Sequence, residues 1–162
     1  LKIDKLKFNK IEYRSTIFGE LYQSHNKTKI NKNFLKLISN KSANKLDLDD
    51  MLFSLKVVKH LKSNAIVLAR NKQTIGLGIG QTNRYEALNI AIVKMKGVFK
   101  KKTFVCSSDG FFPFTDSIEL LKKYGCKSIA QPSGSINDDK LTKYAIKNKL
   151  SLYFTKNRLF KH

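Results

Sequence analysis

The sequence predicts an α/β domain built in layers. Three observations support this prediction: helical and β-rich runs alternate between residues 103 and 155, two β-rich runs upstream flank a tight turn, and polar residues suited to capping precede the helical runs. A chain of 162 residues suits one domain and can bury a substantial core. We expect the binding site of such a domain at the carboxyl ends of its strands.

Residues 1–45 are predicted to be an irregular lead-in with short strands, continuing from a missing upstream region. The runs 11–15 and 17–23 are the strand candidates, and residues 25–27 are typical of a turn. The chain begins with Leu1 and not with Met, and no signal-peptide pattern follows. We therefore expect it to be cut from a longer protein.

The next stretch is predicted to contain a helix, a β-hairpin and a second helix. Asp47 is the predicted cap of the first helix, because its carboxylate can accept hydrogen bonds from unpaired amides of the first turn. β-rich residues then occupy 64–70 and 73–80, on either side of residues 71–72, which indicates a hairpin. Thr82 is the predicted cap of the second helix.

The remaining residues predict a strand–helix alternation that ends in a strand. Asp116 and Glu119 have the D-x-x-E spacing of a capping box, and Gly125 is typical of a helix end. The predicted elements are strands at 103–106, 127–131 and 151–155, and helices at 116–124 and 137–148.

The composition is strongly basic. Lysine and arginine number 32 against 12 acidic residues, a net charge of +20. Such a charge is typical of nucleic-acid-binding proteins, but an AT-rich coding sequence also produces it, by enriching Lys, Asn and Ile together. The lysines are spread along the chain and no aromatic-interleaved RNA-recognition motif is present, which favours the second interpretation. We expect no specific nucleic-acid partner, although the positive field favours anionic ligands.

The cysteines and histidines indicate a reduced protein without a metal. Cys106 and Cys126 form no C-x-x-C pair, and the three histidines show no metal-ligand spacing. No window approaches the roughly 20 apolar residues of a membrane span. We expect a cytoplasmic protein with no disulfide, no metal and no membrane partner.

Segments at the predicted strand ends carry residues that a core does not need. Asn64 could read a carboxamide or an amine, or simply form a turn. The alternate glycines of residues 76–80 leave one strand face bare, so that a ligand or another backbone can approach. Arg84 lies in the first turn of the following helix, where it could bind a carboxylate or a phosphate, or remain a plain surface residue.

Two further strand ends have unusual compositions. Residues 107–116 place three phenylalanines and a proline where a turn would normally have polar residues. Asp109 and Asp116 bracket these rings, which favours a slot for a flat heteroaromatic ligand over a purely structural role. The small residues 132–135 precede a predicted helix, and their amides could form an anion-binding nest or a strand-to-helix turn.

Taken together, these motifs resemble the C-terminal portion of the AICAR transformylase/IMP cyclohydrolase family of purine synthesis. The similarity runs from about residue 12 to the end of the chain and is weak over the lead-in. It is carried by K-H-x-K-S-N-A at 59–65, G-x-G-Q-x-x-R at 78–84, S-D-G-F-F-P-F at 108–114, Q-P-S-G-S at 131–135 and R-L-F-K-H at 158–162. Gly110 stands where the family often has alanine.

The resemblance implies a three-layer, cytidine-deaminase-like α/β fold without zinc, in which a mixed sheet is flanked by helices. Residues 46–162 would form the second of two such subdomains in the transformylase region. The sequence has no H-x-E and no P-C-x-x-C signature, in agreement with a site lacking zinc. The resemblance also implies a homodimer whose active sites form at the subunit interface.

The family reaction transfers a formyl group from the co-substrate 10-formyltetrahydrofolate to the 5-amino group of AICAR. By the resemblance, Asn64, Phe111 and Arg158 would contact AICAR, and a guanidinium such as that of Arg158 suits its phosphate. The folate contacts implied in the same way are Arg84, Asp116, Ser135 and Ile136.

A Lys-His pair performs the proton chemistry in this family, and this chain contains the dipeptide Lys59-His60. We interpret it as a helix-end pair near the negative end of a helix dipole, because the family's catalytic pair belongs to the upstream subdomain. No catalytic residue is therefore expected in this chain, and the IMP cyclohydrolase domain is expected to lie outside it. The alternatives are a basic nucleic-acid-binding α/β module and an inactive fragment.

Overall fold

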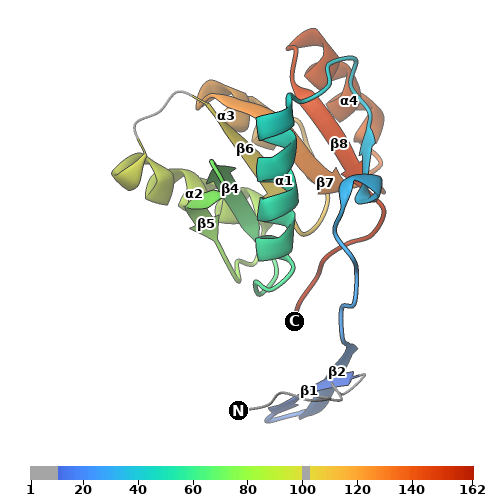
Figure 1. The fold of residues 1–162 in the computed structure, drawn as a ribbon. Coiled ribbons are helices and arrows are strands. Elements are labelled where there is room, and N and C mark those ends of the chain that lie inside the picture. The colour runs from blue at the N-terminus through green and yellow to red at the C-terminus, as the bar shows by residue number, and fades with distance from the viewer. Residues whose placement is uncertain (1–10, 100–102) are drawn as a thin grey trace, which may run out of the picture.

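A computed structural model describes residues 11–99 and 103–162 as a six-stranded mixed sheet with helices on both faces and a separate two-stranded hairpin (Figure 1). The sheet order is β3-β8-β7-β6-β4-β5, in which β6, β7 and β8 are parallel and the other neighbours antiparallel. The strands of the sheet are β3 (Leu35–Leu37), β4 (Ile66–Arg70), β5 (Gln73–Gly78), β6 (Phe104–Ser108), β7 (Cys126–Pro132) and β8 (Ser151–Thr155).

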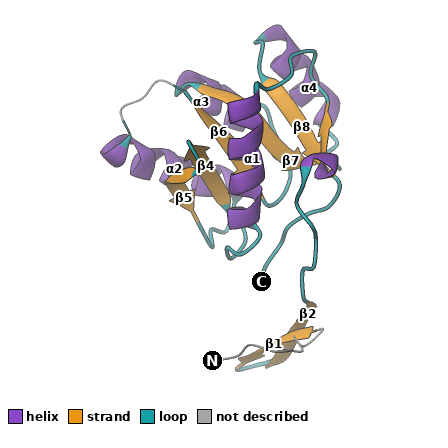
Figure 2. Cartoon of the chain, in the orientation of Figure 1, coloured by secondary structure: helices purple, strands orange, loops and turns teal. Residues whose placement is uncertain are grey.

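The helices form the two outer layers of the domain (Figure 2). They are α1 (Lys45–Val58), α2 (Arg84–Val98), α3 (Asp116–Lys123) and α4 (Asp138–Lys147), with a short 3-10 turn at Lys32–Phe34. Successive side chains of a strand point to opposite faces, so Val67 belongs to the core cluster under α1, while Leu68 belongs to the cluster on the other face, which α2, α3 and α4 cover. The predicted α/β class, with a mixed sheet flanked by helices, is confirmed.

Two glycines of β5 explain how α2 lies against the sheet. A Cβ at Gly76 would lie 2.2 Å from the carbonyl oxygen of Ala91, and one at Gly78 would lie 1.8 Å from that of Ala87. Of the two interpretations of the bare strand face, the structure shows the approach of another backbone. These glycines set the distance between β5 and the helix that carries Arg84.

Two helix caps differ from the prediction by one to three residues. Asn44, and not Asp47, caps α1, because its side-chain oxygen accepts a 2.8 Å hydrogen bond from the amide of Asp47. The carboxylate of Asp47 instead forms a 2.6 Å ion pair with Arg70 of β4. Asn83, and not Thr82, caps α2 in the same way, by accepting from the amide of residue 86 at 2.8 Å.

The predicted capping box at the start of α3 does not form. Thr115 occupies the N-cap and makes no side-chain capping bond. Asp116 is the first helical residue, and its Oδ1 accepts a 2.6 Å hydrogen bond from the adjacent amide of Ser117. The carboxylate therefore remains at the exposed end of the helix.

The hairpin comprises β1 (Ile11–Thr16) and β2 (Gly19–Ser24), close to the two predicted strands. Its turn is at residues 17–18, where the Thr16 hydroxyl accepts from the amide of Phe18 at 3.2 Å and donates to the carbonyl of Gly19 at 2.8 Å. Near the turn predicted at residues 25–27, Asn26 Oδ1 accepts a 3.0 Å hydrogen bond from the amide of Thr28, an Asx turn within the irregular connection that leads toward β3. The hairpin lies apart from the layered body in Figure 1, near the C-terminus.

Candidate functional site

Several chain segments meet at one edge of the six-stranded sheet. The parallel strands β6, β7 and β8 end at this edge, and β4 begins there because it runs antiparallel to β6. The residues before β4 therefore lie at the same edge as those that follow β6, β7 and β8. This arrangement agrees with the predicted position of the site.

Arg84 joins the segment before β4 to the segment after β6. Its Nη2 donates to Asn64 Oδ1 and to Asp109 Oδ1, each at 2.8 Å. Its Nε donates to Ser108 Oγ at 3.0 Å, and its Nη1 donates to the carbonyl oxygen of Phe111 at 3.2 Å. The side chain of Arg84 is 10% exposed and that of Asp109 is fully buried. Two predicted contact residues of different substrates, Asn64 and Arg84, are thus in direct contact.

Arg158 lies over aromatic rings at the same edge. Its guanidinium carbon lies 4.9 Å from the centre of the Phe111 ring and 5.6 Å from that of Phe160. The guanidinium carbon of Arg84 lies 5.8 Å from the same Phe160 ring. Arg158 itself is exposed, so donors that face away from the rings remain accessible to an anion.

Phe160 was not among the predicted site residues, although it lies between the two arginines. A signal was present in the sequence. Leu159 is buried, and in an extended segment its neighbours Arg158 and Phe160 share the opposite side. The motif at 158–162 therefore offers two side chains to the site, those of Arg158 and Phe160.

The C-terminal segment is fixed at this edge by backbone hydrogen bonds. The amide of Leu159 donates to the carbonyl of Asp109 at 2.9 Å, and the amide of Ser63 donates to the carbonyl of Lys161 at 2.9 Å. The amide of Lys161 in turn donates to Ser63 Oγ at 3.1 Å. These bonds hold Arg158 and Phe160 beside the loops that follow α1 and β6.

The remaining predicted folate contacts lie at the N-terminal ends of two helices. Asp116 begins α3, while Ser135 and the fully exposed Ile136 precede α4. Asn137 Nδ2 donates to the carbonyl of Pro113 at 2.7 Å, which ties the loop before α4 to the loop before α3. The structure therefore places Asp116, Ser135 and Ile136 on adjoining loops, linked through residues 111–115 to the cluster around Arg84.

The three phenylalanines of the loop after β6 have different environments. Phe112 is fully buried in the core, and its amide donates to Gln131 Oε1 at 3.1 Å. Phe114 is 60% exposed, whereas Phe111 is half-buried beneath Arg158. The core explanation therefore applies to one ring, and the aromatic surface at the site is made by Phe111 together with Phe160.

The loop after β7 forms a strand-to-helix turn that uses its own side chains. The amide of Gly134 donates to Asp138 Oδ2 at 2.8 Å, and the amide of Asn137 donates to Ser135 Oγ at 3.1 Å. These two amides are therefore occupied. Of the two interpretations of this segment, the structure supports the turn.

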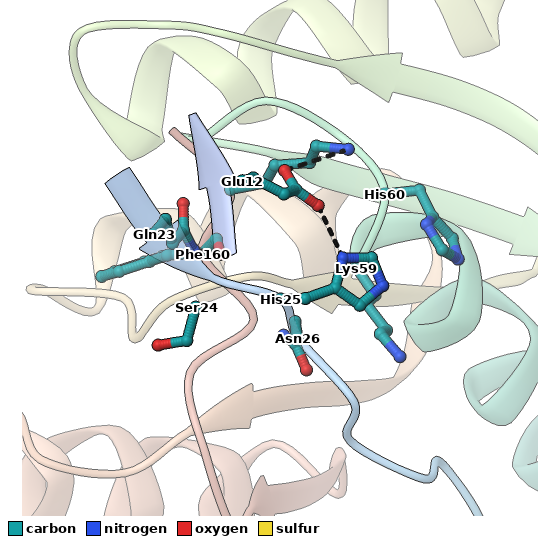
Figure 3. A pocket seen from close by; sticks show the side chains of 9 residues that line it. Glu12, Gln23, Ser24, His25, Asn26, Lys59, His60 and Phe160 are labelled. Atoms are coloured by element: carbon teal, nitrogen blue, oxygen red, sulfur yellow. Dashed lines mark hydrogen bonds and ion pairs between the residues drawn. The ribbon is translucent and has the colours of Figure 1, made fainter. Parts of the chain in front are cut away.

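Lys59 and His60 lie at the end of α1, as predicted, in a crevice between the hairpin and the C-terminal segment (Figure 3). Lys59 Nζ donates to the carbonyl of Thr28 at 3.0 Å. In the same crevice Glu12 is 2.9 Å from His25 Nδ1. Lys59 thus connects the end of α1 to Thr28, in the segment that follows the hairpin.

Residues 11–99 and 103–162 contain no metal-binding cluster and no membrane-spanning helix. That part of the chain has no group of three or more His, Cys, Asp or Glu side chains placed to hold a metal ion. It also has no helix long and apolar enough to cross a membrane. Cys106 and Cys126 are free thiols, and burial raises the pKa of both.

A family model described as the AICARFT/IMPCHase bienzyme matches residues 1–94. The chain belongs to this family. Members similar to the chain include the bifunctional purine biosynthesis protein PurH of Buchnera aphidicola subsp. Baizongia pistaciae, 43% identical over 160 residues and 96% of this chain. The PurH proteins of Wigglesworthia glossinidia brevipalpis and Oceanobacillus iheyensis are 38% and 41% identical over 94% and 100% of this chain. The chain spans 30%, 29% and 32% of the lengths of these three family members.

A solved structure with a weaker likeness is a diaminohydroxyphosphoribosylaminopyrimidine deaminase/5-amino-6-(5-phosphoribosylamino)uracil reductase from Thermotoga maritima. It is 14% identical, with a TM-score of 0.37 over 64% of this chain and 33% of that chain.

Proposed function

We propose that this chain forms part of the AICAR transformylase site of a bifunctional purine-synthesis enzyme. The observation that carries the proposal is the convergence of Asn64, Phe111 and Arg158, which come from three distant segments, on one edge of the sheet. Arg84 contacts the first two directly, and the Phe111 ring contacts the third. These are the residues that the resemblance assigns to AICAR.

The chemistry of this cluster suits a phosphorylated heteroaromatic ligand. The exposed guanidinium of Arg158 can donate two parallel hydrogen bonds to a phosphate. The rings of Phe111 and Phe160 offer apolar faces beside it. A net charge of +20 adds a field that attracts the anion. AICAR combines a phosphate with a flat imidazole, and both parts have a complementary group here.

The folate would lie on the adjoining loops. The carboxylate of Asp116, at the exposed start of α3, can accept hydrogen bonds from N–H groups of a pterin. Ser135 and the exposed Ile136 would face the same co-substrate from the start of α4. In this arrangement AICAR and 10-formyltetrahydrofolate meet near the loop of residues 111–115.

The reaction itself needs more than this chain. The lone pair of the AICAR amine attacks the formyl carbon, the amine loses a proton, and the bond from that carbon to N10 of the folate breaks as N10 takes up a proton. The amine is a weak nucleophile because its lone pair is delocalised into the imidazole and carboxamide, so orientation and a general base are both required. We place the base, a Lys-His pair, in the upstream subdomain, and assign binding and orientation to this chain.

We further propose that this chain is one part of a longer, dimeric protein. Residues 46–162 would be the second cytidine-deaminase-like subdomain, without zinc, of a cytoplasmic homodimer with active sites at the subunit interface. The IMP cyclohydrolase domain would lie elsewhere in the protein. The coverage of only about 30% of the PurH relatives supports this division.

A formyl-transfer assay on the purified 162-residue chain, with calorimetric titration of AICAR, tests the proposal. We expect saturable AICAR binding without turnover, because the chain has substrate contacts and no base. A full-length PurH protein of the family serves as the positive control for the assay. Turnover by the chain alone would contradict the placement of the base, and an absence of AICAR binding would contradict the assigned contacts.

A further inference from the structure

Arg84 is largely committed to contacts within the chain. Four of the five N–H groups of a guanidinium are used in its bonds to Asn64, Ser108, Asp109 and Phe111. Its side chain is only 10% exposed. A guanidinium with these contacts has few N–H groups left to bind a ligand. It is well placed to hold the groups around it.

The first group that Arg84 holds is the amide of Asn64. Nδ2 of Asn64 donates to the carbonyls of Gln81 and Thr82, at 3.0 and 3.1 Å, which uses both of its hydrogens. Oδ1 accepts from Arg84 at 2.8 Å. Backbone carbonyls can only accept and a guanidinium can only donate, so these three partners fix the orientation of the amide. A second lone pair on Oδ1 is what the side chain can offer to a ligand.

The second group is the buried carboxylate of Asp109, which orients Arg84. Asp109 is fully buried, and its Oδ1 lies 2.8 Å from Nη2 of Arg84. Its backbone is fixed on both sides, because its amide donates to the carbonyl of Ala65 and its carbonyl accepts from the amide of Leu159. A buried carboxylate cannot reach a ligand at the surface. It acts on the site through the charge and position of Arg84.

Gly110 leaves the space in which the guanidinium lies. A Cβ at this position would be 2.3 Å from Nη2 of Arg84 and 2.7 Å from Cε1 of Phe160. The guanidinium therefore lies in the space that a side chain at residue 110 would enter. Both crowded groups are side-chain ends, so an added methyl group would displace the guanidinium and leave the backbone in place.

We propose that Arg84 is a positioning residue, held by Asp109, that presents Asn64 to the ligand as a hydrogen-bond acceptor only. The inference rests on the proposed function and deepens it. The ligand group opposite Asn64 must donate. AICAR has two such groups on its ring, the 5-amino group and the carboxamide NH2, and we assign the 5-amino group to Asn64. Arg84 also donates to the carbonyl oxygen of Phe111. It therefore fixes the side chain of Asn64 and the loop after β6 relative to each other.

The test is calorimetric titration of the 162-residue chain with AICAR and with the analogue that has hydrogen in place of the 5-amino group. The wild-type chain should prefer AICAR by about five- to tenfold, the contribution of one hydrogen bond. In Arg84→Lys the preference should disappear, because a lysine cannot bridge the four partners of Arg84. It should also disappear in Asp109→Asn, because an uncharged residue 109 no longer anchors the guanidinium. Arg14→Lys and Asp139→Asn are the matched controls, since both residues are exposed, and they should retain the preference.

A direct role of Arg84 in folate binding gives a different result. In that case Arg84→Lys would weaken the binding of a folate analogue, Asp109→Asn would not affect AICAR selectivity, and the inference would be wrong. The ratio of the two affinities is independent of how much protein is folded, so a loss of stability alone would not change it.

If the wild-type chain bound neither nucleotide, the proposed function would fail, and the positioning role could still be decided by NMR. Nitrogen-15 spectra of the wild-type chain should show an Arg84 Nε–H and an Asn64 side-chain amide that exchange slowly with solvent. In Asp109→Asn both signals should shift and exchange faster, while the backbone signals of β7 and β8 stay in place. Unchanged Arg84 and Asn64 signals in that variant would overturn the inference.

Discussion

The guanidinium carbon of Arg158 lies 4.9 Å from the centre of the Phe111 ring, so that the segment after β8 rests on the loop after β6. A cation over a ring face is attracted by the ring's quadrupole, which restricts the motion of an otherwise exposed side chain. The planar fork remains available on its exposed side. The contact thus holds in place the group that we propose to bind the AICAR phosphate.

Replacement of Arg158 by alanine should therefore weaken AICAR binding about 10- to 100-fold, as expected for the loss of charge-assisted hydrogen bonds worth roughly 1.5–3 kcal/mol. Calorimetric titration measures this change. Lys156→Ala is the matched control, because it removes the same charge from an exposed residue of the same segment. An equal loss in both variants would mean that only the overall field, and not the position of Arg158, matters.

The packing of α2 on β5 predicts opposite effects for two glycine substitutions. Gly78→Ala places a Cβ 1.8 Å from the backbone carbonyl of Ala87, and backbone cannot move aside cheaply, so we expect a loss of about 3 kcal/mol or more. A Cβ at Gly97 of α2 would meet no atom within 4 Å. Gly97→Ala should therefore raise the free energy of unfolding by about 0.5–1 kcal/mol through its higher helix propensity. Urea unfolding of both variants measures these changes. Similar stabilities for the two would contradict the described packing.

The buried thiols predict a loss of stability at alkaline pH. Burial raises the pKa of Cys106, with a further contribution from nearby Cys126, and burial also raises the pKa of Cys126. Their contribution to stability is fully present below the unfolded pKa of about 8.5 and is lost as the pH rises above it, at up to about 1.36 kcal/mol per pH unit for each thiol.

Urea unfolding of the chain between pH 7 and 10.5 checks this expectation. The free energy of unfolding should fall above about pH 8.5, and it should fall less steeply in the double variant Cys106→Ala, Cys126→Ala. Lysines and tyrosines titrate in both proteins and cancel in the comparison. Parallel curves would show that the thiols ionise alike in the folded and unfolded chains.

The net charge of +20 predicts only weak association with nucleic acid. Without an assembled recognition surface, binding arises from the release of counterions and its affinity falls steeply with salt. A fluorescence titration with double-stranded DNA at 50 and 200 mM salt should lose most of the binding at the higher salt. Tight binding that survives at 200 mM would support the nucleic-acid-binding alternative.

The strands and helices could be predicted because their signals are local. The turn at residues 71–72 forms as predicted between β4 and β5, and the alternation from β6 to β8 follows the predicted order. The caps of α1 and α2 were misplaced because several polar side chains lie close together in each segment. A capping side chain must accept a hydrogen bond from the amide three residues after it. Backbone geometry decides which of the polar side chains can do so, and composition does not encode that geometry.

The meeting of the candidate site segments at one edge could be predicted, but the contacts among their side chains could not. Strand order brings the marked segments to one edge, and the sequence motifs identified those segments. The internal bonds of Arg84 depend on Asp109, which is 25 residues away in sequence. Such contacts follow from tertiary packing, so a sequence motif shows that an arginine is present without showing which partners it binds.

The most direct test of the account is a nitrogen-15 NMR titration of the 162-residue chain with AICAR. We predict saturable shifts that are largest at residues 63–64, 109–111 and 158–160, the segments joined by Arg84 and Arg158. No shifts at millimolar AICAR, or shifts scattered over the exposed lysines of every element, would contradict the assignment of this edge as the AICAR site.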